Sequence, residues 1–259
     1  MSDPFESPKL LVRGAEEDQA EISSLASAFF SDFKASIFTE ADAKTEDHVV
    51  YVAPPTPPEK LRRRAAEVLN SLRHSLDQAA YSASTQIGTK YENSTYFPFA
   101  ADPNDFDQCL FNGKKARCRG IPESLRPYLR KLEPWWATKE RPPTGNDLLR
   151  ALGSSTGPNK HRAVLQTGIV STSVNIRSMT MCSIRYPYRW HEDRRVLEIA
   201  RTAQPDAMKI DMYIPMTLSF GNVRGIGGLP LEAIISDLIK MTKGIVNGIE
   251  AETNQLRNR

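Results

Sequence analysis

The feature that most limits how this chain can fold is a long stretch of helical periodicity between residues 59 and 84. Its apolar side chains recur three and four residues apart, the spacing that places them along one side of an α-helix. Pro54, Pro55, Pro57 and Pro58 precede it. Because each proline fixes its own φ and disfavours helix in the residue before it, we expect the helix to begin after this block. The apolar side consists of Leu61, Ala65, Val68, Leu69, Leu72, Leu76, Ala79 and Ala83.

Other segments also predict amphipathic helices, since their apolar residues share one face. Pro122 and Pro230 each stand where a proline can begin a helix without losing a hydrogen bond. Residues 253–259 are polar and are expected to fray. The helices outside residues 59–84 are predicted over 15–34, 122–132, 145–152 and 230–252, with a weaker signal over 106–117.

Several other segments have the composition of β-strands. Residues 36–39 and 48–52 predict a hairpin, the second being rich in β-branched and aromatic residues. Beyond residue 163 the chain is rich in Val, Ile, Tyr, Thr and Met between polar turns, which predicts an antiparallel sheet. Its strands are expected over 163–174, 179–186, 195–201 and 208–220.

This order of elements predicts an α+β fold, with amphipathic helices packed on a mostly antiparallel sheet formed by the C-terminal half and the N-terminal hairpin. If the hairpin over 36–52 joins the strands over 163–220, residues 1–259 make a single interleaved domain. The helical layer then comes mainly from 15–34 and 59–160, and 230–252 closes the fold.

Composition places the chain among soluble globular proteins. A net charge of +3 is too small to demand a nucleic-acid partner, although it leaves room for a local basic patch. Cys109, Cys118 and Cys182 have no close paired spacing, which predicts reduced thiols. No apolar run has the length of a secretory signal core or of the roughly 18 residues of a membrane span. We therefore expect a cytoplasmic protein without membrane contact.

The long helix also carries a polar face that could do chemistry. At about 100° per residue, Asn70, His74, Asp77 and Tyr81 fall opposite the apolar side, with Arg73 beside them. A histidine near a carboxylate is an arrangement that general acid/base chemistry uses. The alternative is a solvated face, in which Arg73 and Asp77 form only a surface pair.

A second candidate segment follows a glycine- and serine-rich run. If Pro158 begins a helical turn, free backbone amides lie beside Lys160, His161 and Arg162 and would attract an anion. The alternative is an exposed turn. Glycines between 221 and 228 match neither a P-loop nor a dinucleotide fingerprint and indicate a connector. The four histidines are scattered, so neither a metal site nor a cofactor is expected.

These segments resemble a family of uncharacterised bacterial cytosolic proteins. Its marks are a helix reading Asn-Leu-Arg-x-x-Leu-Asp-His and a later Asp-Lys-His-Arg segment. The resemblance covers most of the first 165 residues and implies that the two polar segments form one site. It is carried by Asn70, Leu72, Arg73, Leu76, Asp77 and Tyr81, then Phe97 and Pro98, then Lys160, His161 and Arg162, with Phe5, Arg13 and Ala15 as an early part.

The same helix motif is similar to the Arg-x4-His pattern of HEPN domains, helical modules that include RNA-cutting toxins. Gln78 stands where that pattern has histidine, and glutamine cannot exchange a proton. The C-terminal strands are also foreign to an all-helical module. A ribonuclease activity is therefore disfavoured, and whether the chain is an enzyme stays open.

The sequence thus predicts a pocket for an anionic ligand, such as a phosphate, a nucleotide or an RNA backbone. Arg73 and Arg162 would hold the anion, and His74 or His161, tuned by Asp77, would be the acid/base if there is chemistry. Asn70, Tyr81 and Lys160 would complete the binding residues. The alternative is a non-catalytic structural or interaction module, alone or as a homo-oligomer, whose polar face only ties helices together.

Overall fold

The computed structural model divides the described part of the chain into two compact units, and each unit is assembled from separate stretches of sequence. Unit 1 contains residues 1–25, 59–167 and 219–259, and unit 2 contains residues 26–58 and 168–218. The prediction of one interleaved domain stays a prediction. The described residues are 3–31, 36–53, 56–89, 91–111, 117–139, 141–155, 167–171, 175–179, 184–185, 189–191, 193–203, 210–213, 216–221 and 223–259.

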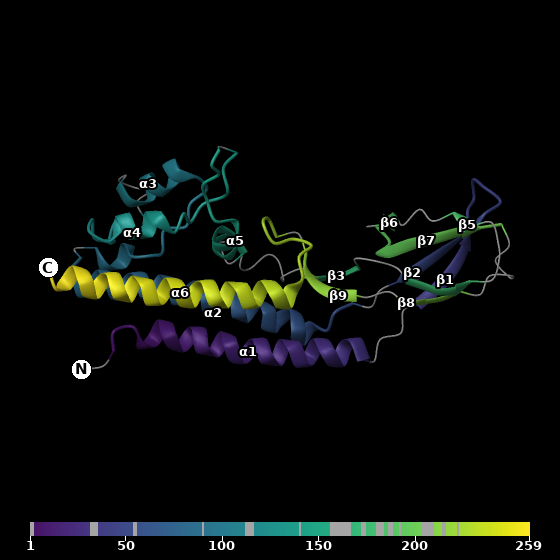
Figure 1. The fold of residues 1–259 in the computed structure, drawn as a ribbon, viewed down its shortest axis with the longest axis horizontal. Coiled ribbons are helices and arrows are strands. Elements are labelled where there is room, and N and C mark those ends of the chain that lie inside the picture. Colours follow the sequence, from purple (N-terminus) through teal and green to yellow (C-terminus); the bar gives the residue numbers. More distant parts are fainter. Residues whose placement is uncertain are drawn as a thin grey trace. The chain divides into compact units, whose positions relative to one another are not determined.

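Three long helices run side by side in unit 1 (Figure 1). They are α1 (Glu6–Ser31), α2 (Glu59–Ile87) and α6 (Leu231–Arg257). The Nζ of Lys9 lies 2.7 Å from Glu250 Oε1 and that of Lys243 lies 2.8 Å from Glu16 Oε1, so α1 and α6 are antiparallel.

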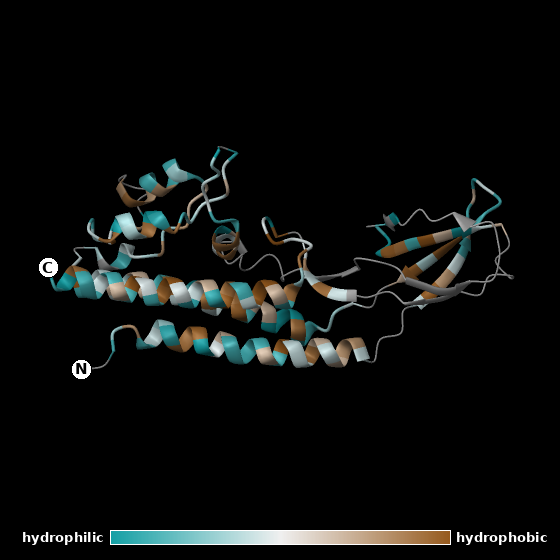
Figure 2. Ribbon diagram, viewed as in Figure 1, coloured by the Kyte–Doolittle hydropathy of each residue, from teal (hydrophilic) through white to brown (hydrophobic). Residues whose placement is uncertain are grey.

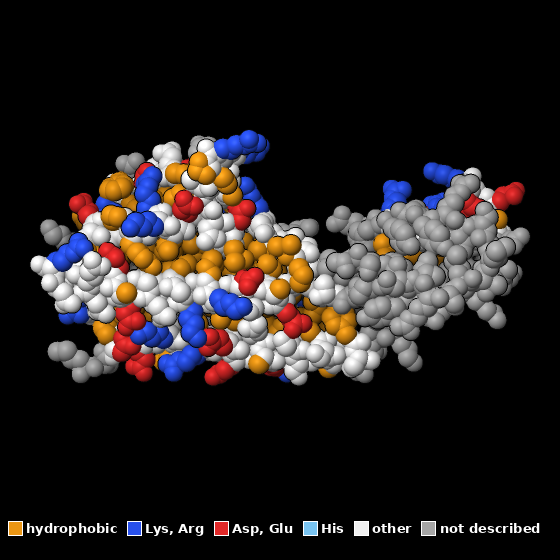
Figure 3. All heavy atoms as spheres, viewed as in Figure 1, with side chains coloured by type: hydrophobic (Ala, Val, Ile, Leu, Met, Phe, Trp, Pro, Cys, Tyr) orange, Lys and Arg blue, Asp and Glu red, His pale blue; other side chains and the backbone are white. Residues whose placement is uncertain are grey.

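The contacts of α1 with α2 show that these two helices are antiparallel as well. Arg64 Nη2 lies 2.7 Å from Glu21 Oε2 near one end of the pair. Near the other end, the hydroxyl of Ser75 donates to the carbonyl of Pro8 at 2.8 Å. Helix α1 is therefore antiparallel to both partners, and α2 and α6 are parallel. Figure 3 shows acidic and basic side chains interspersed along the edge of the unit where α1 lies.

The predicted apolar side of α2 is the core of unit 1. All eight of its residues are buried, seven of them with no exposed surface and Leu69 at 1%. In the described chain, α2 makes its most extensive helix contacts with α6, whose Leu231, Ile235, Leu238 and Ile249 are also fully buried. Figure 2 shows the hydrophobic residues recurring along these helices. Because burial contributes about 25 cal/mol per Å² of apolar surface, this fully buried stripe stabilises the unit.

Shorter helices connect α2 to the β-strands. The structure has η1 (Glu92–Ser94), α3 (Pro103–Phe111), α4 (Arg126–Lys131) and α5 (Asp147–Ser155). Helix α4 begins four residues later than predicted because Pro122 opens a separate turn, in which the Leu125 amide donates to the Pro122 carbonyl at 3.0 Å. Trp135 is buried beneath these helices at 4% exposure.

The predicted hairpin exists and joins the later strands. In unit 2, β1 (Ser36–Ala41) pairs antiparallel with β2 (His48–Ala53), and β2 pairs antiparallel with β7 (Val196–Thr202). Along its other edge, β7 pairs with β5 (Ile184–Arg185) and then β6 (Arg189–His191), both antiparallel. Together with the helices of unit 1, this sheet confirms the predicted α+β class, whereas the packing of the helices on the sheet stays a prediction.

The remaining strands form two smaller ladders. They are β3 (Thr167–Ser171), β4 (Asn175–Met179), β8 (Ile210–Tyr213) and β9 (Met216–Phe220). β3 pairs with β9, and β4 pairs antiparallel with β8. The single strand predicted over 208–220 is therefore two strands with different partners.

The prediction of a frayed end after residue 252 is wrong, since α6 continues to Arg257. Thr253 has no exposed surface, and its hydroxyl donates to the Ile249 carbonyl at 2.7 Å, so this turn packs on the unit. None of the described helices has both the length and the apolar character of a membrane span.

Candidate functional site

The five polar residues predicted on the long helix all lie on α2, but their surroundings differ. His74 is exposed, and Tyr81 has 44% of its surface exposed. Asn70 is half-buried. The side chains of Arg73 and Asp77 are only 21% and 19% exposed, and both contact other elements of unit 1. The face is therefore divided into an exposed part and a part that packs.

Asp77 fixes the chain that follows η1. Its Oδ1 accepts the backbone N–H of Phe97 at 2.9 Å, and its Oδ2 lies 3.7 Å from Arg73 Nε. Phe97 is 2% exposed, so its amide has little access to water. A buried amide needs a partner, and Asp77 supplies one.

Arg73 attaches α2 to α5. Its Nη1 donates to the carbonyl oxygen of Gly153, and its guanidinium lies over the Phe99 ring at 5.1 Å from the centroid. Glycine is needed at position 153, because a Cβ there would lie 2.4 Å from Phe99 Cδ1. The arginine and aspartate of the predicted site thus hold two neighbouring segments in place.

The other half of the predicted site lies outside the described residues. Residues 156–166 include Lys160, His161 and Arg162, so their meeting with Asn70, Arg73 and His74 stays a prediction. Gln78, which stands at the histidine position of the HEPN pattern, accepts a hydrogen bond from the Ser7 hydroxyl at 2.6 Å. This residue helps to join α1 to α2.

A cationic cluster in unit 1 was not predicted from the sequence. Arg150 of α5 and Arg224 of the loop before α6 both lie over the Trp136 ring, at 5.3 and 4.4 Å from its centroid. The loop can approach because Gly225 has φ +84° and carries no Cβ, which would lie 2.9 Å from Trp136 Cζ3. We call Arg150 and Arg224, which lie over Trp136, together with Arg73 and Arg117, whose charges also act on Arg150, the arginine cluster.

The charges of this cluster act on one another. Burial lowers the pKa of the Arg150 guanidinium, and although Asp105 works in the opposite direction, Arg73, Arg117 and Arg224 lower it further. Arg150 Nε is buried and has no hydrogen-bond partner among the described residues. Within the same residues, Arg117, Arg150 and Arg224 make no ion pair with a carboxylate. An anion would relieve this repulsion.

Little in the sequence signals the arginine cluster. Its members are spread between positions 73 and 224, and three of them belong to separate connections or short helices. In the structure Trp135 is buried, whereas Trp136 is half-buried beneath the two arginines.

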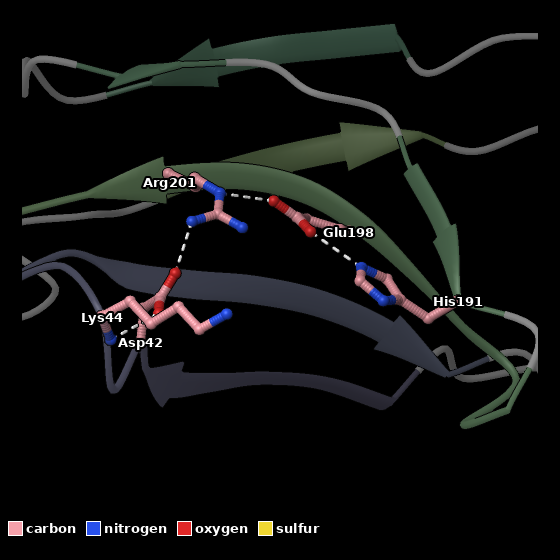
Figure 4. A network of polar contacts seen from close by, with 5 residues as sticks. All are labelled: Asp42, Lys44, His191, Glu198 and Arg201. Carbon is pink, nitrogen blue, oxygen red and sulfur yellow. Dashed lines mark hydrogen bonds and ion pairs between the residues drawn. The ribbon is translucent and has the colours of Figure 1, made fainter.

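Unit 2 contains a second polar network, centred on a buried carboxylate (Figure 4). Glu198 of β7 has a side chain that is 1% exposed, and its two oxygens lie 2.8 Å from His191 Nε2 and 2.6 Å from Arg201 Nε. Arg201 Nη1 also donates to Asp42 Oδ2 at 2.6 Å. Asp42 Oδ1 accepts the backbone N–H of Lys44 at 2.9 Å, which closes the β1–β2 turn.

These contacts set the charge of the network. Burial raises the pKa of Glu198, but the hydrogen bonds from Arg201 and His191 outweigh it, so the pKa lies below its ordinary value. The bonds to Glu198 and then Asp42 raise the pKa of Arg201. The Lys44 amide, followed by Arg201, lowers that of Asp42. Each charge has a counterpart, which is typical of a network that stabilises a sheet.

The helical unit also has a cavity of about 370 Å³ between α3 and α4. Phe106, Leu110 and Phe111 line one side of it, and Arg126 and Arg130 line the other. Arg130 pairs with Asp107 on its rim. None of the residues predicted for the site on α2 lines this cavity. In the described part of the chain, no group of three or more His, Cys, Asp or Glu residues could hold a metal ion.

Comparison with known proteins identifies no relative. No protein-family model, no curated protein and no solved structure matches this chain. The resemblance to the bacterial family therefore stays a prediction.

Proposed function

We propose that the protein binds an anionic ligand, a phosphate, a nucleotide or an RNA backbone, at the arginine cluster of its helical unit. The observation that carries the proposal is the pair of arginines over Trp136. Both lack a carboxylate partner among the described residues, and Arg150 has a buried nitrogen that makes no hydrogen bond there. Guanidinium groups beside an aromatic ring suit phosphate, because they offer several donors in a planar fork.

The proposal keeps the ligand predicted from the sequence and moves the centre of the site. Arg73 belongs both to the predicted polar face and to the cluster, through its bond to Gly153 in the same helix as Arg150. Helix α5 ends at Ser155, and five to seven residues later the chain has Lys160, His161 and Arg162. Their part in binding is a separate proposal. A ligand of this class also suits the proposed cytoplasmic location.

The contacts of Asp77 include a structural role for this carboxylate. Its carboxylate accepts the Phe97 amide and lies beside Arg73. If His74 or His161 is an acid/base catalyst, the Asp77 carboxylate must also stabilise the charged form of that histidine. We therefore propose these acid/base roles only as an addition to binding, to be tested by RNA cleavage.

Isothermal titration calorimetry with inorganic phosphate, a nucleoside triphosphate and a short single-stranded RNA tests the proposal. Arg224→Gln removes an exposed charge over Trp136, and roughly 10- to 100-fold weaker binding is expected, since a hydrogen bond to a charged group contributes about 1.5–3 kcal/mol. Arg63→Gln is the matched control, because Arg63 lies on α2 with 66% of its side chain exposed. An RNA ligand would show a steep salt dependence, and a single phosphate a shallow one.

Two results contradict the proposal. One is that none of the three probes binds at low salt. The other is that Arg224→Gln and Arg63→Gln weaken binding equally, which indicates a general effect of net charge.

The second candidate is the non-catalytic structural or interaction module, which the packing of the polar face favours. Arg73 and Asp77 tie α2 to α5 and to the segment around Phe97. In that case, Asp77→Ala and Arg73→Ala lower stability, while Arg224→Gln has no effect on any ligand.

A further inference from the structure

Two of the three cysteines meet inside unit 1, although the sequence gives them no close paired spacing. The sulfur of Cys109, in α3, lies 2.7 Å from the sulfur of Cys118, and both residues are buried free cysteines. The backbone N–H of Cys118 also donates to the Cys109 carbonyl at 3.2 Å. The two residues are thus held together by main chain as well as by side chain.

The chain on the far side of Cys118 is fixed. The Ile121 amide donates to the Cys118 carbonyl at 3.0 Å, and the Gly120 amide donates to the Ser94 carbonyl at 2.9 Å. Gly120 has no room for a side chain, since a Cβ would lie 2.2 Å from Thr95 Oγ1. The two sulfur atoms would have to approach only from 2.7 Å to the disulfide bond length of about 2.05 Å, while these contacts hold the chain that follows Cys118.

The two thiols differ in how readily they lose a proton. The hydrogen bond from Cys118 lowers the pKa of Cys109, against the effect of burial, and the charge of Arg117 acts in the same direction. The same hydrogen bond, together with burial, raises the pKa of Cys118. Cys109 is therefore the better nucleophile, because the thiolate is the reactive form.

We propose that Cys109 and Cys118 are a site of reversible oxidation, at which a hydroperoxide converts the two thiols into an intramolecular disulfide. The Cys109 thiolate attacks one peroxide oxygen, the O–O bond breaks, and the sulfur becomes a sulfenic acid while hydroxide or alkoxide leaves. The Cys118 thiol then attacks this sulfur, the S–O bond breaks, and water leaves. Two electrons pass from the thiols to the peroxide, and a dithiol reductant returns them.

The oxidation proposal rests on other observations than the anion-binding proposal, so either one can fail alone. Oxidation would close a ring over residues 110–117, which includes Arg117 of the arginine cluster. Hydrogen peroxide is the suitable probe because both residues are buried, at 4% and 2% exposure, and a small oxidant needs little access.

The test compares the folded Cys182→Ser protein before and after treatment with hydrogen peroxide. That variant removes the third thiol, and native protein is treated in parallel. Peptide mapping without reductant should find a Cys109–Cys118 linkage with the loss of two hydrogens, and dithiothreitol should restore both thiols. In Cys118→Ser, the sulfenic acid on Cys109 has no thiol to resolve it and should be captured by a dimedone probe.

The contrary results are equally specific. One is the recovery of both thiols unlinked from folded protein at a peroxide concentration that oxidises a control dithiol peptide. The other is a linkage that forms only between molecules. Either result overturns the proposal. Equal dimedone labelling of Cys109 in the presence and absence of Cys118 overturns it too, since a resolving thiol must suppress the label.

Discussion

Replacement of Asp77 by alanine tests whether the polar face of α2 is a structural contact. The change removes the acceptor of the Phe97 amide, which is 2% exposed, and leaves that N–H unsatisfied at a cost of about 1–3 kcal/mol. It also removes the 3.7 Å ion pair with Arg73, which contributes about 0–1 kcal/mol because both side chains keep some exposure. We expect a loss of about 2–3 kcal/mol, or roughly 5–10 °C in Tm.

Asp77→Asn is the matched control for this change. Asparagine keeps a carbonyl oxygen where the Phe97 amide can donate, so most of the stability should return even though the negative charge is gone. Far-UV circular dichroism during thermal unfolding is a suitable assay, because the described long helices lie mainly in unit 1 and their signal reports on that unit.

The reasoning would be refuted if the alanine and asparagine variants lost the same stability. That result would assign the effect to the charge and not to the hydrogen bond. An alanine variant as stable as the native protein would refute it more simply, since the Phe97 amide would then have another partner.

Further predictions concern packing and pH. The low pKa of Glu198 adds stability that is present above its ordinary value of 4.5 and is lost as the pH falls through the lower folded value. On acidification, the free energy of unfolding measured with urea should therefore fall more for the native protein than for Glu198→Gln. Leu72→Ala should cost about 2–5 kcal/mol in urea unfolding, because the residue has no exposed surface. Gly153→Ala should destabilise by about 1–3 kcal/mol through its clash with Phe99, whereas Gly244→Ala, with nothing within 4 Å, should stabilise α6 by about 0.5–1 kcal/mol. The opposite order of Tm for the two glycine variants would contradict that packing.

The long helices could be predicted because their signal is local and repeated. Eight apolar positions on α2 agree on one period, and all eight are buried. The hairpin over 36–52 was predicted for a similar reason, since its second strand has β-branched residues on a short, bounded run. Repetition makes such elements robust to any single residue that departs from the pattern.

The contacts of the candidate site could not be predicted in this way. Asp77 accepts the amide of Phe97, which lies beyond the end of its own helix. Arg150 and Arg224 lie over the same tryptophan although they are far apart in the sequence. Nothing in the sequence distinguishes Glu198 from other residues of its strand. The contacts of its buried carboxylate with His191 and Arg201 offset the cost of removing the charge from water. Each of these depends on tertiary structure and leaves no periodic trace in the sequence.

The parallel pairing of α2 with α6 has a consequence for how the protein is made. The two helices are the most extensively contacting pair in the described chain, yet the segments of unit 2 that lie between residues 168 and 218 are synthesised before α6. Until residue 231 and its successors leave the ribosome, the buried side of α2 lacks its main partner. Nascent chains that end before this point should therefore bind chaperones that recognise apolar segments, and release should coincide with the emergence of α6.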